Sequence, residues 1–171
     1  MTRFIVAIVT VFALALPGMA KEMKIGYIDS EAILGQYPDY QEAQRKLGEE
    51  EQKYVAEAQA KELVVNTMLE EIQQQSLMLS AEARSEREKK LIEKRRELEQ
   101  FRVETWGEGG KLYNKNIELS RPILEKINQA IEKISQEDGY DMVFDAAGGN
   151  IVFAVPQYDI TELVLAELKK E

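Results

Sequence analysis

The chain has 171 residues, a formal net charge of −9, and neither cysteine nor histidine. The missing side chains exclude thiol chemistry, imidazole catalysis at neutral pH and standard zinc sites. The acidic balance argues against nucleic acid as the main partner, because phosphate binding requires a basic surface. Charged residues make up 31% and aromatic residues 8%, which favours long helices over a thick globular core.

The first twenty residues have the pattern of a secretory signal peptide. Arg3 gives a basic start, an uncharged apolar run covers residues 4–16, and residues 17–20 supply small side chains before a cleavage site. The run is shorter than the ~20 apolar residues of a membrane-spanning helix. We therefore expect export, with cleavage after Ala20. The alternative is an uncleaved N-terminal anchor.

A short β-strand is predicted over residues 24–28, where Ile25, Tyr27 and Ile28 are strand formers. A short helical turn over residues 31–35 should follow it, ended by a glycine and then a proline.

Residues 40–79 contain no proline and favour a helix throughout. A heptad register beginning at Leu47 places apolar residues at seven of ten core positions. Forty helical residues would form a rod of about 60 Å.

A second helix is predicted over residues 81–136, with Ser80 as its N-cap. Two long helices joined by a very short connection must lie antiparallel. The middle of the chain is therefore predicted to be a long helical hairpin with its tip near Ser80.

Two features interrupt the returning helix. Glycines lie close together at Gly107, Gly109 and Gly110, and the hairpin places them opposite a stretch near Gly48. We interpret these four glycines as a hinge; the alternative is simple tolerance of glycine on a solvated helix. Pro122 should kink or restart the helix. A regular apolar stripe follows, and we expect it to pack on the body of the protein. The stripe consists of Tyr113, Ile117, Ser120, Leu124, Ile127, Ile131 and Ile134.

Two apolar β segments are predicted near the C-terminus, over residues 142–144 and 151–154, joined by a hairpin-type turn at 146–150. Asp159 and Glu162 then have the spacing of a capping box that begins a final helix, which extends to about Lys169.

These elements predict an α+β, mostly α fold in which a long antiparallel helical hairpin projects from a small β body. Residues 1–20 are the signal peptide. Residues 21–39 and 138–171 form the β body with its C-terminal helix. Residues 40–137 form the hairpin arm.

The residues expected for catalysis are missing. The glycines at residues 107–110 are not followed by Lys-Ser or Lys-Thr at the interval of a phosphate loop, and those at 148–149 form too short a run and lack the following helix. The acidic residues at 138, 141 and 145 lack the spacing of an EF-hand. We therefore expect no cofactor, no metal and no enzymatic activity.

Several motifs, in order, resemble the Skp/OmpH family of periplasmic chaperones. Lys24, Ile25, Tyr27, Ile28 and Asp29 form a K-I-x-Y-I-D strand, and residues 79–84 read L-S-A-E-A-R at the tip. Residues 122–131 match a P-I-x-x-K-I-x-x-A-I helix, residues 139–145 match G-Y-D-x-V-x-D, and residues 159–161 open the last helix with D-I-T.

The resemblance implies a homotrimer in which strands of three chains build one central β body and three hairpins enclose a cavity. It implies that unfolded outer-membrane β-barrel proteins are held there without ATP, in the periplasm. The residues expected in the trimer body are Ile25, Tyr27, Ile28, Val143, Phe144, Val152 and Phe153.

Adaptable apolar side chains near the tip are candidates for binding these clients. Leu69, Leu77 and Met78 lie off the heptad stripe and are the preferred candidates, whereas Met68 and Ile72 also fit the hairpin's own core.

The chain departs from well-studied family members in being acidic, so no lipopolysaccharide-binding residue is assigned. Residues 72–103 nevertheless carry a net charge of +2, which is typical of a solvated helix face with paired charges. The alternative is a weak contact of these residues with a client or an anionic membrane surface. For the whole chain, the alternative function is a structural coiled-coil protein of the cell envelope that binds no client.

Overall fold

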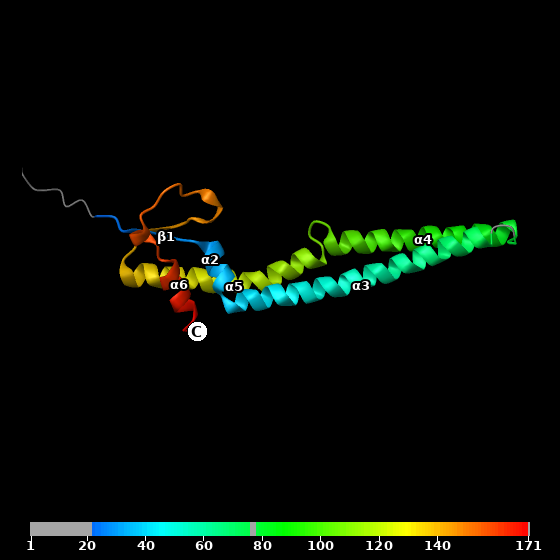
Figure 1. Cartoon of the computed structure of the whole chain (residues 1–171). Coiled ribbons are helices and arrows are strands. Elements are labelled where there is room, and N and C mark those ends of the chain that lie inside the picture. Colours follow the sequence, from blue (N-terminus) through cyan, green and yellow to red (C-terminus); the bar gives the residue numbers. More distant parts are fainter. Residues whose placement is uncertain (1–21, 76–77, 171) are drawn as a thin grey trace, which may run out of the picture.

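The fold is that of a computed structural model, which describes residues 22–75 and 78–170. The predicted signal peptide over residues 1–20, with its cleavage after Ala20, lies outside the described residues, as does Leu77. The molecule consists of a small body and one long arm (Figure 1).

The elements follow one another from the body into the arm and back. They are β1 (Ile25–Ile28), α2 (Ser30–Gln36), α3 (Pro38–Gln74), α4 (Ala81–Trp106), α5 (Lys111–Asp138), β2 (Met142–Asp145) and α6 (Thr161–Leu168), with 3₁₀ turns η1 (Ala147–Gly149) and η2 (Pro156–Tyr158) before α6.

The arm is a hairpin of α3 and α4, which lie side by side and antiparallel (Figure 1). Pro38 begins α3, where its missing N–H costs no helical hydrogen bond. Ser80 caps α4, and its hydroxyl accepts a hydrogen bond from the backbone N–H of Ala83 at 3.2 Å. The predicted hairpin and the mostly helical α+β class are thus confirmed.

The returning arm is two helices rather than one. α4 ends at Trp106, and α5 begins at Lys111, so the break falls on the glycines. The expected restart at Pro122 is wrong, because α5 continues through it. In the other arm, α3 runs unbroken through Gly48.

In the body, a pair of parallel strands joins the segment before the arm to the segment after it. β1 and β2 pair in register from Ile25 opposite Met142 to Ile28 opposite Asp145. The predicted second C-terminal strand at residues 151–154 is wrong for the single chain, since this segment pairs with no described strand. The hairpin-type turn is replaced by η1, in which Gly148 has a φ of 77°.

One hydrophobic core joins the body to the inner end of the arm. It combines β1, α2, the start of α3, α5 and α6. The buried side chains are Ile28, Ile33, Tyr37, Ala43, Ile123, Ile127, Ala130, Ile134, Ile160, Val164, Leu165 and Leu168.

The predicted apolar stripe of the second helix is shifted at its start. The buried face of α5 begins with Ile123 rather than Leu124, whereas Tyr113 and Leu124 are exposed. Packing against the body therefore buries a neighbouring row of side chains on α5, and part of the predicted stripe remains exposed.

A buried carboxylate fixes α6 on α5. Glu167 accepts hydrogen bonds from Lys133 Nζ at 2.5 Å and from Lys170 Nζ at 2.7 Å. The hydrogen bond from Lys133, and then that from Lys170, lowers the pKa of Glu167 below its ordinary value of 4.5. Because the folded-state pKa is the lower one, the stabilisation is complete above about pH 4.5 and is lost as the pH falls through the folded-state pKa.

We predict that Glu167→Gln lowers the melting temperature at neutral pH and flattens its decline below about pH 4.5. The measurement is the melting temperature from pH 7 to pH 3 at one protein concentration. Glu162→Gln is the control, because Glu162 is exposed on the same helix. If Glu167→Gln and the unaltered chain give parallel curves, the role of this carboxylate is refuted.

Candidate functional site

The arm is held together by a narrow core. Val65 and Ile72 of α3 pack with Leu91 and Leu98 of α4, so each helix contributes buried residues at heptad spacing. Two helices can bury only one stripe each against the other, and the rest of both surfaces remains exposed.

The predicted client-binding residues divide into three groups. Ile72 is buried in the arm core, and Met68 and Leu69 are half-buried against it. Leu69 therefore packs on the stripe from which it was expected to point away. Met78 is 87% exposed beside the tip, and Leu77 lies outside the described residues.

Apolar side chains are also exposed along the arm, far from the tip. Five of them were not predicted from the sequence, where the available signal was an apolar residue outside the buried heptad rows. These five are Leu63, Val64, Ile92, Val103 and Trp106. Tyr113 and Leu124 belong to the stripe that was predicted to pack on the body, and they are exposed as well.

The break between α4 and α5 requires glycine. Gly109 has a φ of 69°, in the left-handed region. A Cβ on Gly110 would lie 2.8–2.9 Å from three backbone carbonyl oxygens. Beside them, the hydroxyl of Thr105 is fully buried and has no hydrogen-bond partner among the described residues.

An aromatic cluster packs between the helices of the arm beside this break. The ring of Phe101 lies 6.2 Å from that of Tyr54 on α3 and 6.0 Å from that of Trp106, both edge-to-face. The ammonium groups of Lys61 and Lys111 lie 5.2 Å and 5.4 Å from the Phe101 ring centroid. These contacts connect both sides of the break to α3.

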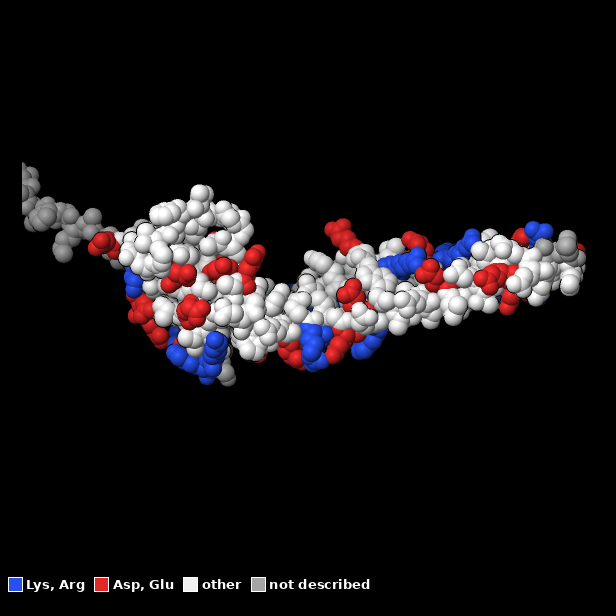
Figure 2. All heavy atoms as spheres, viewed as in Figure 1, with Lys and Arg blue, Asp and Glu red and all other residues white. Residues whose placement is uncertain are grey.

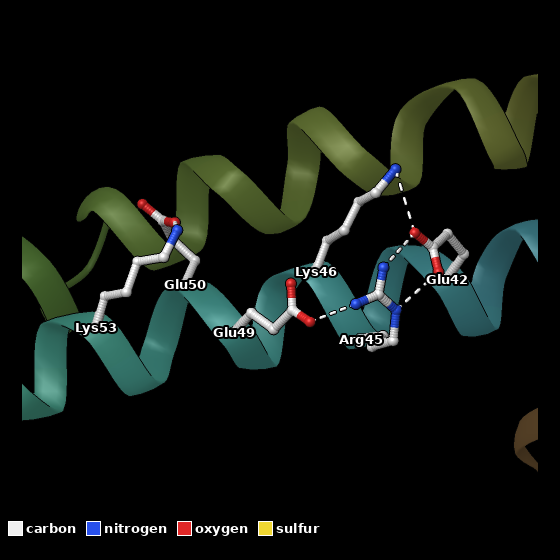
Figure 3. A network of polar contacts seen from close by, with 6 residues as sticks. All are labelled: Glu42, Arg45, Lys46, Glu49, Glu50 and Lys53. Atoms are coloured by element: carbon white, nitrogen blue, oxygen red, sulfur yellow. Dashed lines mark hydrogen bonds and ion pairs between the residues drawn. The ribbon is translucent and has the colours of Figure 1, made fainter.

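Paired charges cover the exposed face of α3 (Figure 3). Arg45 bonds both Glu42 and Glu49, and Lys46 lies 3.5 Å from Glu42. The hydrogen bond from Arg45 lowers the pKa of Glu42 to about 2. Such exposed pairs keep the arm soluble and contribute little to its stability.

The predicted trimer-body residues lie on β1, on β2 and on the segment after β2, and Ile28 and Val143 pack in the core of their own chain. Ile28 is buried in its own chain, and Tyr27 and Val143 are half-buried. Val152 and Phe153 are 98% and 84% exposed, and Ile25 and Phe144 are also exposed. The segment from 146 to 158 carries no charge, and the corresponding loop is an uncharged part of the surface in Figure 2.

A hollow of about 510 Å³ separates this loop from the strands. Ile25, Tyr27, Phe144, Ile151 and Phe153 contribute to its lining.

The part of the chain that the structure describes contains neither a metal-binding cluster nor a membrane-spanning helix. No group of three or more acidic, histidine or cysteine side chains there could hold a metal ion. Across residues 22–75 and 78–170, none of the helices has the length and apolar character needed to cross a membrane.

Comparison with known proteins gives matches over nearly the whole chain. The sequence model of the OmpH-like outer membrane protein family matches residues 24–168. A protein of Yersinia enterocolitica named Chaperone protein Skp is 26% identical over 157 residues, which are 92% of this chain and 93% of that protein. A protein of the same name from Vibrio cholerae is 23% identical over 146 residues, which are 85% of this chain and 83% of that protein.

A solved structure has the same fold. A crystal structure of an OmpH-like protein from Caulobacter crescentus CB15 superposes with a TM-score of 0.75 at 14% sequence identity. The match covers 87% of this chain and 85% of the Caulobacter chain.

We predict opposite effects for two glycine-to-alanine changes in the arm. Gly110→Ala should destabilise the arm by roughly 1–3 kcal/mol, because the new Cβ meets backbone oxygens. Gly48→Ala should stabilise it by about 1 kcal/mol, because nothing lies within 4 Å of the added Cβ and alanine favours the helix. Amide hydrogen exchange of α3 and α4 measures both effects. Equal exchange in the two variants would contradict the assignment.

Proposed function

The chain belongs to the OmpH-like family of outer membrane proteins, and from this membership we propose that it is an ATP-independent holdase chaperone of the periplasm. Its clients are unfolded outer-membrane β-barrel proteins, held in a cavity between the arms of a homotrimer. The relatives from Yersinia and Vibrio carry the name of a chaperone rather than of an enzyme.

The observation that carries this proposal is the arm with exposed apolar side chains. A holdase must bind many sequences weakly and release them without fuel, and scattered, adaptable apolar contacts suit that task. Met78 near the tip and Leu63, Ile92 and Val103 along the arm supply such contacts. In a trimer, a client bound by one arm is held near the other two arms. Several weak contacts can therefore give a useful overall affinity.

The homotrimer is supported by the unpaired segment of the body. Residues 151–154 have a strand-forming sequence but no partner strand in the single chain. Phe153 lies beside the exposed Ile25 and Phe144, and such a contiguous exposed apolar patch is typical of an interface. Val152, next to Phe153 in the chain, is also exposed. A neighbouring copy would supply both the strand partner and the cover, with Ile25, Phe144 and the half-buried Tyr27 in the same interface.

The glycine break supports the proposal that the arm bends. A bend at Gly107, Gly109 and Gly110 would move the outer arm relative to the body and adapt the cavity to clients of different size. At Gly48 the helix α3 is continuous, so this glycine would contribute to the hinge only by lowering the local stability of the helix. Rapid amide exchange at residues 107–110 would support the hinge, and strong protection would contradict it.

We predict that a stoichiometric amount of the trimer suppresses aggregation of an outer-membrane barrel diluted out of urea, without ATP. Light scattering measures aggregation, and a folded soluble protein at the same concentration is the control. Unchanged aggregation would refute the holdase function. It would favour the alternative, a structural coiled-coil protein of the cell envelope that binds no client.

We predict a trimer mass in native mass spectrometry, and its loss in Phe153→Glu. The glutamate would place a charge in a dry interface, which is costly when the charge has no partner. Ile92→Glu, at an exposed apolar position of the arm, should keep the trimer mass. A stable monomer of the unaltered chain would disprove the assembly.

A further inference from the structure

An apolar groove lies at the base of the arm, where α2, the start of α3 and α5 come together (Figure 1). Its volume is about 500 Å³. Leu34 and Tyr40 line one part of it, and Ile117 and Leu124 of α5 line another. We call this the base groove.

The walls of the base groove are anchored in the body core. Leu34 and Tyr40 pack against the body core on their other side. The opposite face of α5 is fixed in the same core by Ile123 and Ile127. A surface whose walls are already ordered loses little entropy when it binds a partner.

The rim is polar but carries no net charge. Asn116, Ser120 and Asn128 provide amide and hydroxyl groups, and Arg121 and Glu125 carry opposite charges. The hydroxyl of Ser120 donates to Asn116 Oδ1 at 3.2 Å. An apolar floor with neutral donors and acceptors at its rim matches a polypeptide backbone together with an apolar side chain.

We propose that the base groove binds a short extended segment of an unfolded outer-membrane protein, with one apolar side chain inserted between Leu124 and Tyr40. The inference rests on the proposed function and names the place on the arm where a client segment is held. Outer-membrane strands alternate apolar and polar residues, so each such segment offers an apolar side chain for the floor and a polar one for the rim.

The size of the base groove distinguishes this occupant from a second copy of the chain. Nine residues line the groove, whereas a stable protein–protein interface uses roughly 20–30 residues on each side. The exposed helix around it is charged, with Lys115 and Glu118 paired at 2.8 Å. Such a small neutral hollow is suited to a peptide segment.

Leu124→Gln tests the proposal, because Leu124 is 48% exposed and its change leaves the body core intact. Leu163→Gln is the matched control, since Leu163 of α6 is also 48% exposed and lies outside the groove. The probe is a fluorescently labelled outer-membrane barrel protein, diluted out of urea and titrated with each trimer.

We expect Leu124→Gln to raise the Kd about tenfold, which corresponds to the loss of one buried leucine contact. Leu163→Gln should leave the Kd unchanged. A photo-crosslinking side chain at Ser120 should bond the labelled client.

Three outcomes would overturn the proposal. If the unaltered chain binds the probe, but Leu124→Gln binds it equally well and Ser120 gives no crosslink, the base groove fails and the proposed function stands. If Leu124→Gln changes the trimer mass in native mass spectrometry, the groove is an interface between copies. If the unaltered chain does not bind the probe, the proposed function fails as well.

Discussion

Two antiparallel helices can bury only one stripe each, and this constraint governs the whole molecule. The outer arm has a small cluster of four buried side chains, Val65, Ile72, Leu91 and Leu98, with Ala58 and Phe101 also buried along it, whereas the body has a contiguous core that joins five elements. The parallel pairing of β1 with β2 joins the two chain segments at either end of the arm. The arm is therefore an insertion between two paired strands.

The charges on the arm cannot replace the missing core. An exposed i,i+4 ion pair such as Arg84–Glu88 stabilises a helix by about 0.3–0.5 kcal/mol, while one buried leucine contributes about 1.5–3 kcal/mol. The many paired charges keep the exposed helices in solution. They also explain how an acidic chain can carry a long arm without strong repulsion, because opposite charges alternate along it (Figure 2).

Several local features of the fold and the helical hairpin could be predicted from the sequence, whereas the packing of the body could not. The cap at Ser80 and the heptad spacing of Val65 and Ile72 depend only on neighbouring residues, and both predictions agree with the structure. The choice of Ile123 over Leu124 as a buried residue depends on the body, which the helix pattern does not contain. The strand predicted at 151–154 has no partner in the single chain. The base groove was missed because three separate elements form it.

The glycine break separates the two surfaces that we assign to clients. Gly107 and Gly110 lie between the arm core and the body core, and the base groove is entirely on the body side of them. If the arm bends there, Met78 and the outer apolar side chains move while Leu124 and Tyr40 stay fixed. A client segment seated in a fixed groove would then keep its place while the outer arms adapt to the rest of the unfolded chain. The buried Thr105 hydroxyl, which costs on the order of 1–3 kcal/mol without a hydrogen bond, indicates that this junction is not built for maximal stability.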